Sequence, residues 1–163
     1  MELSTNHFKK LSMALKKKKG KQIVISKPTT VDGINFKSML EVYTYKKLKA
    51  NNIPFSYEQN SFCLVPGFMP TLDYWENKNK VFKKKNNIKV QPITYTPDFT
   101  DPHGKWIIEV KGRANESFPL RWKLFKRWLE SPDEVLFVLP TLYLPTCQAD
   151  VNITIQNIID SQK

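Results

Sequence analysis

Two segments of the chain carry apolar residues at the spacing of an α-helix. The first runs from Phe36 to about Ala50, and its apolar stripe is formed by Phe36, Met39, Leu40 and Tyr43. The second follows Ser117, a candidate N-cap, and has Pro119 in its first turn. Its apolar flank is formed by Leu120, Leu124, Phe125, Trp128 and Leu129. We therefore predict two amphipathic helices that pack against a sheet.

Short apolar runs predict the strands of that sheet. They cover residues 53–58, 62–65, 91–99, 105–111 and 134–139. The third and fourth runs are joined by Thr100-Asp101-Pro102-His103-Gly104, whose Asp, Pro and Gly favour a turn, so we predict a hairpin there. The element order is α-β-β-β-α-β. This order predicts an α/β fold with a mixed central sheet flanked by helices.

Length and composition indicate one folded domain. The chain has 163 residues, of which 40% are hydrophobic and 12% aromatic, which is enough to bury a core. We expect a flexible basic arm at 1–26, a core at 27–140 and an acidic C-terminal extension at 141–163. Within the core, 68–90 should form a basic loop or a mobile hairpin. In the extension, 151–159 alternate like a strand, but Asp150 could equally cap a short helix, so their structure stays open.

The charge of the chain is positive and unevenly distributed. There are 26 Lys and Arg against 15 Asp and Glu, which gives a net charge of +11. Lysines gather in residues 1–22, including Lys16, Lys17 and Lys18, and in residues 78–89, including Lys83, Lys84 and Lys85. Each cluster is either a solvated surface or a surface that binds the phosphates of a nucleic acid. Tyr74, Trp75 and Phe82 near the second cluster either stack on bases or pack the loop, and we favour packing.

Other classes of protein fit the sequence less well. No run approaches the ~20 apolar residues of a membrane helix, and the basic N-terminus lacks the apolar region of a signal peptide. We therefore expect a soluble protein of the cytoplasm, without a membrane partner. Cys63 and Cys147 belong to no C-x-x-C motif or Cys/His cluster, so we expect two buried free thiols rather than a zinc site or a disulfide.

The predicted hairpin carries the clearest chemistry. Asp98 ends one strand, and Glu109 and Lys111 end the other, with ten residues between the two acids. Side chains two apart on a strand share a face, so Glu109 and Lys111 should lie together with Asp98 alongside. Grouping carboxylates among apolar neighbours is costly unless a cation joins them. Asp98, Glu109 and the Val110 carbonyl are hard oxygen ligands that suit Mg²⁺.

Such a site could hydrolyse a phosphodiester. A bound metal would stabilise charge on the phosphate and lower the pKa of a water, while Lys111 would orient or deprotonate the attacking water or offset developing charge. The alternative is an exposed Glu109–Lys111 ion pair on a surface hairpin, worth at most ~1 kcal/mol.

The combination of motifs resembles the PD-(D/E)XK nuclease superfamily. More specifically, it resembles the small phage Holliday-junction resolvases, endonuclease I and related short phage endonucleases. The strings that carry the likeness are Val31–Phe36 (VDGINF), Phe36–Glu41 (FKSMLE), Pro92–Phe99 (PITYTPDF) and Glu109–Gly112 (EVKG), within roughly residues 27–130. One departure is that 68–90 is longer and richer in lysine than in endonuclease I, which leaves the dimer arrangement and the DNA path open.

The resemblance implies a restriction-endonuclease-like fold and a function. It implies a homodimeric endonuclease that cuts branched DNA, four-way junctions above all, with Mg²⁺ as cofactor and Mn²⁺ able to substitute, acting in the host cytoplasm if the chain is phage-encoded. It also assigns Glu41, on the first helix, to the metal; the alternative is a surface glutamate paired with a lysine. The runners-up are a duplex or single-strand nuclease of the same superfamily and a non-catalytic basic nucleic-acid-binding module.

Further cations border the predicted site in sequence. Arg113 directly follows the motif and could contact a flanking phosphate. Lys123, Lys126 and Arg127 lie three and four residues apart on the second helix, opposite its apolar flank. This basic face either binds the DNA backbone or is merely solvated.

Overall fold

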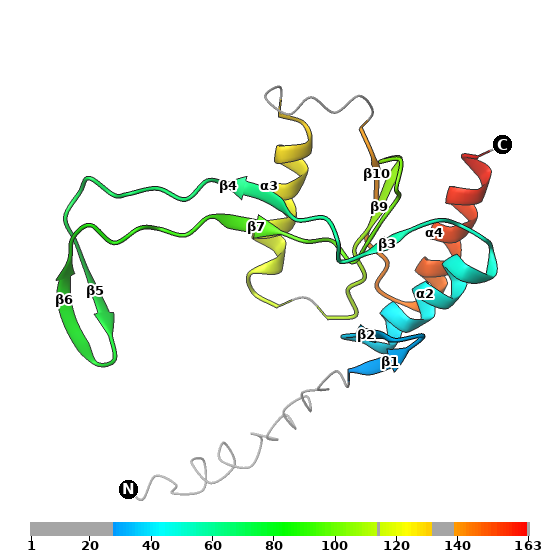
Figure 1. Ribbon diagram of the computed structural model, residues 1–163, viewed down its shortest axis with the longest axis horizontal. Helices are drawn as coiled ribbons and strands as arrows, with labels where there is room; N and C mark the ends of the chain where they lie inside the picture. Colours follow the sequence, from blue (N-terminus) through cyan, green and yellow to red (C-terminus); the bar gives the residue numbers. More distant parts are fainter. Residues whose placement is uncertain (1–27, 114, 132–138, 163) are drawn as a thin grey trace, which may run out of the picture.

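A central mixed sheet organises the chain in the computed structural model, which describes residues 28–113, 115–131 and 139–162 (Figure 1). Its strands lie in the order β10-β9-β8-β3. Their bounds are Ser56–Tyr57 for β3, Phe99–Thr100 for β8, Trp106–Ile108 for β9 and Thr141–Tyr143 for β10. β3, β8 and β9 are antiparallel neighbours, and β10 runs parallel to β9. The protein is thus a mixed α/β fold.

Three helices in the described residues cover the two faces of this sheet (Figure 1). α2 (Met39–Ala50) and α4 (Gln148–Asp160) pack on each other and on one face, whereas α3 (Phe118–Leu129) covers the other. Successive side chains of β9 point to opposite faces of the sheet and so contact different helices. Trp106 and Ile108 join the core under α2 and α4, whereas Ile107 packs with α3. The sheet is therefore buried on both faces.

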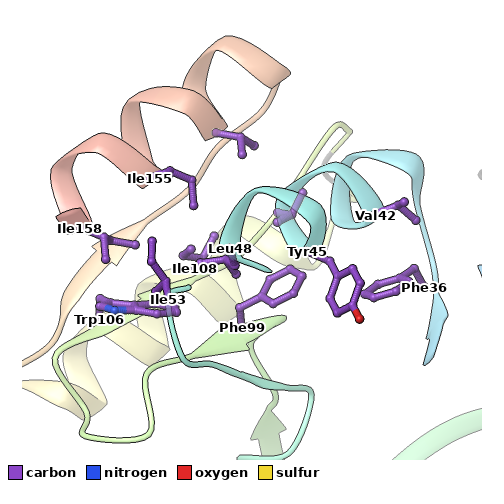
Figure 2. Packing of buried hydrophobic residues seen from close by; sticks show 12 residues of the cluster. Phe36, Val42, Tyr45, Leu48, Ile53, Phe99, Trp106, Ile108, Ile155 and Ile158 are labelled. Atoms are coloured by element: carbon purple, nitrogen blue, oxygen red, sulfur yellow. The ribbon is translucent and has the colours of Figure 1, made fainter. Parts of the chain in front are cut away.

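The larger core lies between the sheet and the α2–α4 pair. Aromatic rings from several elements meet there, among them Phe36, Tyr45 and Phe99, and aliphatic side chains fill the space between α4 and β9 (Figure 2). Fully burying one such apolar side chain contributes about 1.5–3 kcal/mol. The end of the sheet is consequently a rigid support for the residues that follow β9.

A long two-stranded arm leaves this body (Figure 1). β4 (Phe62–Val65) pairs with β7 (Ile93–Tyr95), Phe68 bridges to Val90, and β5 (Tyr74–Lys78) pairs with β6 (Val81–Lys85) at the far end. Asn79 and Lys80 form the turn with φ of +56° and +65°, as a two-residue type I′ hairpin requires. A shorter hairpin, β1 (Thr29–Val31) with β2 (Ile34–Phe36), precedes α2. Of the two forms expected for 68–90, the structure has the hairpin.

Several predicted elements are confirmed with altered bounds. The helix expected from Phe36 begins at Met39, because Phe36 ends β2 and Ser38 caps the helix. The predicted strand 91–99 divides into β7 and β8, which pair with different neighbours. The helix after Ser117 is α3, but Asn115 rather than the Ser117 side chain accepts the N–H of Phe118, at 2.9 Å. Most of the predicted strand 134–139 lies outside the described residues.

Other expectations are wrong. Met39 and Leu120, expected in apolar stripes, are exposed, and the buried side of α2 is formed by Glu41, Val42, Thr44, Tyr45 and Leu48. Because Glu41 and Thr44 are polar, a search for apolar residues at helical spacing does not identify this side of α2 as the buried one. Residues 141–160 are no extension, because β10 joins the sheet and α4 joins the core. Both cysteines are exposed; they are free thiols.

Candidate active site

The β8–β9 hairpin brings the two predicted acids together. Phe99 pairs with Ile108, so the same register continued by one residue sets Asp98 opposite Glu109. The backbone N–H of Val110 donates to Asp98 Oδ2 at 2.7 Å and fixes the aspartate across the hairpin. The predicted juxtaposition of Asp98 and Glu109 is therefore observed.

Lys111 lies with Glu109, as the alternation of the strand predicts. Val110 points into the core under α2 and α4, whereas Lys111 Nζ is 3.3 Å from Glu109 Oε1. The same ammonium lies 4.8 Å from the ring centroid of Phe118, at the start of α3. The ring face attracts the cation and holds Lys111 over the site. This ion pair is not the exposed surface pair of the alternative interpretation, because Glu109 is buried.

Burial makes the two carboxylates electrostatically unfavourable. Asp98 is 8% exposed and Glu109 4%. Loss of solvation, followed by repulsion from Glu109, raises the pKa of Asp98 to about 8. Loss of solvation also raises the pKa of Glu109, although the Lys111 ammonium opposes this. A strongly perturbed acid pair at a sheet end is a typical mark of a functional site.

One oxygen of the pair has no partner of its own. Glu109 Oε2 is buried and makes no hydrogen bond to the residues that the structure describes. The buried Tyr95 hydroxyl lies close enough to the Glu109 carboxylate that, after burial, this carboxylate raises the pKa of Tyr95, but the two groups do not meet in hydrogen-bond geometry. A buried polar atom without a partner costs about 1–3 kcal/mol, so such an atom calls for an explanation.

A divalent cation would account for these features. It would join two repelling carboxylates and satisfy the free oxygen of Glu109. No three His, Cys, Asp or Glu side chains lie close enough to hold a metal in the described part of the chain. Mg²⁺, however, is commonly held by one or two carboxylates and keeps several waters. Asp98 and Glu109, with the Val110 carbonyl that the sequence suggested, therefore fit this ion.

Glu41 is buried near this pair but has partners of its own. Ser38 Oγ donates to Oε1 at 2.7 Å and, as the N-cap of α2, accepts from the Glu41 N–H at 3.2 Å. Tyr57 and the Lys37 N–H donate to Oε2 at 2.8 and 2.9 Å. The Glu41 charge contributes to the raised pKa of Asp98. Glu41 thus lies within electrostatic reach of the acids, and it is not the lysine-paired surface glutamate of the alternative interpretation.

Lys37 and Glu58 are neighbours of the site that the sequence patterns missed. They form an ion pair, and the N–H of Glu58 donates to the Asp98 carbonyl at 2.9 Å. Glu58 has a φ of +47°, which is uncommon for a non-glycine residue and typical of strained functional segments. The Glu58 hydrogen bond raises the pKa of Lys37, with smaller contributions from Asp98 and Glu41. Only the short spacing from Lys37 to Glu41 could have pointed to the lysine.

The predicted DNA-binding residues fall into separate groups. Arg113, Lys123, Lys126 and Arg127 are exposed, and the last three lie opposite the buried Phe125 and Leu129 of α3. Lys83 and Lys84 are exposed on the arm, and Lys84 pairs with Asp73 at 2.6 Å. Lys85 is buried, so its ammonium is less open to a phosphate than those of Lys83 and Lys84. Lys16, Lys17 and Lys18 lie outside the described residues.

No helix in the described ranges has the length and apolar character needed to cross a membrane.

Comparisons with known proteins give a family but no activity. No curated protein and no solved structure matches the chain. Residues 16–134, well over half of the sequence, match a family described as "Protein of unknown function (DUF1064)". The chain therefore belongs to the DUF1064 family.

Proposed function

We propose that this protein is a Mg²⁺-dependent DNA endonuclease of the PD-(D/E)XK type, with a restriction-endonuclease-like arrangement of its sheet and helices. The observation that carries the proposal is the buried Asp98–Glu109 pair beside Lys111, in which Glu109 Oε2 has no partner among the described residues. Such a pair is unfavourable for stability alone, so a function that uses a cation explains its presence.

Each residue has a distinct task in this mechanism. Asp98 and Glu109, with the Val110 carbonyl, would hold the cation, which when bound supplies charge stabilisation and a more acidic water. Lys111 lies against Glu109 and over Phe118, so its ammonium is oriented to hold the attacking water or the scissile phosphate. The Val110 N–H keeps Asp98 in place. Glu41, whose carboxylate oxygens accept from Ser38 and Tyr57, would bind or orient the metal at the edge of the site, as the resemblance implies.

The preferred substrate is branched DNA, with the four-way junction first. This part of the proposal is supported by the motif strings shared with phage junction resolvases. The described residues of one chain hold one such site, so symmetric cuts across a junction need two copies related by a two-fold axis. We therefore propose a homodimer that acts in the cytoplasm, leaves 5′-phosphate and 3′-hydroxyl ends and accepts Mn²⁺ in place of Mg²⁺.

A cleavage assay tests the metal site. The purified protein is incubated with a four-way junction and a matched linear duplex, in Mg²⁺ and in EDTA. Asp98→Asn and Glu109→Gln should each abolish cleavage. Asp101→Asn is the matched control, because Asp101 is also buried but accepts the Lys105 N–H at the turn end of the hairpin, at 2.8 Å. Cleavage that persists in EDTA or in the first two variants would refute the proposed metal site.

The same assay separates the alternative functions. Equal cutting of junction and duplex would remove the junction preference and leave a general nuclease of the superfamily. Binding of both substrates without cleavage in Mg²⁺ or Mn²⁺ would favour a basic binding module instead.

A further inference from the structure

The hairpin at the end of the arm presents two different faces. Cross-strand partners in an antiparallel pair point to the same side, and Trp75 pairs with Lys84 while Asn77 pairs with Phe82. These four residues therefore share one face, which we call the aromatic face. Tyr74, Glu76, Lys78, Val81, Lys83 and Lys85 point to the other side. The hairpin itself lies at the far end of the arm, away from the folded body (Figure 1).

The two rings of this face pack on each other but remain open to solvent. Trp75 and Phe82 are stacked, with centroids 5.5 Å apart and an interplanar angle of 30°. Their exposed fractions are 58% and 66%. The packing expected for these aromatics is thus present within the hairpin, yet it leaves most of both rings uncovered. Large exposed rings on a projecting hairpin indicate a surface that binds something.

The charge around the rings identifies the kind of ligand. Residues 66–92 contain six lysines and two acids, so the arm is strongly basic. Lys84 lies on the aromatic face itself, where Asp73 holds its ammonium. Exposed aromatic rings among cations are the usual platform for single-stranded nucleic acid, because bases stack on the rings while cations follow the phosphates.

We propose that the aromatic face binds unpaired nucleotides of DNA, with bases stacking on Trp75 and Phe82 and phosphates attracted by Lys84 and by the positive charge of the arm. In naming DNA as the ligand, this inference rests on the proposed function. A paired duplex hides its base faces inside the stack and offers only phosphates to this surface. The arm therefore recognises strands that have opened, as at a branch point or a single-stranded tail.

A second copy of the chain fits the aromatic face less well. Two partly exposed rings offer at most a few hundred Å², whereas a stable dimer buries about 800 Å² per partner. An identical basic arm facing this one would also bring lysines against lysines. A short strand of nucleotides matches both the size and the charge of the surface.

Binding to oligo(dT) in EDTA tests the inference without cleavage. Trp75→Leu and Phe82→Leu should each weaken binding about 5- to 150-fold, the range expected for loss of one base stack. Trp75→Phe, which keeps a ring, should restore most of the affinity. Val81→Ala is the matched control, because Val81 is an exposed apolar residue on the opposite face of the same hairpin. Circular dichroism checks that each variant is folded.

The readouts separate this inference from the proposed function. Affinity for a blunt duplex should change less than twofold in the leucine variants, and junction cleavage in Mg²⁺ is measured separately. Unchanged oligo(dT) binding, or an equal loss for duplex, overturns the inference even if the wild type cleaves junctions. A leucine variant that alters the mass in solution and leaves oligo(dT) binding intact also overturns it, in favour of contact between copies. If the wild type cleaves nothing while oligo(dT) binding depends on Trp75, the inference stands and the proposed function fails.

Discussion

At the scale of single residues, the closeness of the buried Asp98 and Glu109 carboxylates costs stability. Their position opposite each other could be predicted, because hairpin register and strand alternation depend only on local sequence. The Tyr95 hydroxyl beside Glu109 and the Lys37–Glu58 ion pair could not, because both depend on how β7, β3 and α2 meet around the hairpin. The sequence therefore predicts the acids and the lysine, but not the surroundings that shift the pKa values.

Asp98→Asn should stabilise the metal-free protein while it abolishes cleavage. The folded state raises the pKa of Asp98 from 3.8 to about 8, so it favours the protonated form. The stability that protonated Asp98 contributes is fully present below about pH 4 and is lost as the pH rises toward 8. At pH 8 in EDTA, we expect the Tm to rise by about 2–8 °C, on the scale of ~1 kcal/mol per 2–4 °C.

Asp150→Asn provides a control of opposite sign. The pKa of Asp150 is lowered, because the backbone N–H and the hydroxyl of Thr146 donate to it. Its stabilising effect exists above the unfolded pKa and is lost in acid, so this variant should lower the Tm at pH 8. An Asp98→Asn protein that is no more stable than wild type at pH 8 would contradict the conclusion that the ionised Asp98 carboxylate destabilises the folded protein.

Lys111→Ala should separate catalysis from binding. The ammonium contacts Glu109 and Phe118, so under the proposed function its loss would remove positive charge beside the scissile phosphate. Cleavage should fall at least about 100-fold, as when an electrostatic donor is removed from an active site. Junction affinity in EDTA should stay within about threefold. Lys105→Ala, an exposed lysine at the other end of β9, is the control. A comparable loss of binding in Lys111→Ala would argue against the assigned role.

At the scale of elements, turns could be predicted better than helix faces. The turn after β8 follows from Asp101, Pro102 and Gly104. The turn between β1 and β2 follows from Asp32 and Gly33, whose φ values are +52° and +79°. The sequence does not decide between strand and helix for α4. Its β-branched residues favour a strand locally, whereas burial of Val151, Ile155 and Ile158 against α2 and the sheet favours a helix. Their spacing of four and three residues is helical, but it competes with a clear alternation. Tertiary packing decided between the two.

A pair of substitutions in α4 tests whether this helix belongs to the core. Ile155 is 4% exposed and lies in the main cluster, whereas Ile153 is 62% exposed. Ile155→Ala should lower the free energy of unfolding in urea by about 2–4 kcal/mol. Ile153→Ala should change it by less than about 0.5 kcal/mol. Equal, small effects would mean that 141–160 is an extension after all.

At the scale of the whole molecule, the arm and the candidate site divide the positive charge. Asp98, Glu109 and Lys111 are held at the end of a sheet that is covered on both faces, whereas the arm carries its lysines away from the body (Figure 1). Among the described residues, Lys111 and Lys37 lie near the acids, whereas six lysines belong to residues 66–92 of the arm. Binding strength and cleavage should therefore respond separately to changes in charge.

The salt dependence of junction binding tests this division. Each phosphate contact contributes about 0.9 to the slope of log K against log salt. Replacing Lys78, Lys80 and Lys83 with alanine should reduce the slope by about one to three and leave single-turnover cleavage at saturating protein within about twofold. The control replaces Lys46 and Lys47 on α2, which covers the face of the sheet opposite α3, and its slope should match wild type. If the arm variant keeps the wild-type slope, the arm makes no phosphate contacts; if its saturated cleavage rate collapses, the arm acts on the chemistry and the two functions are not separate.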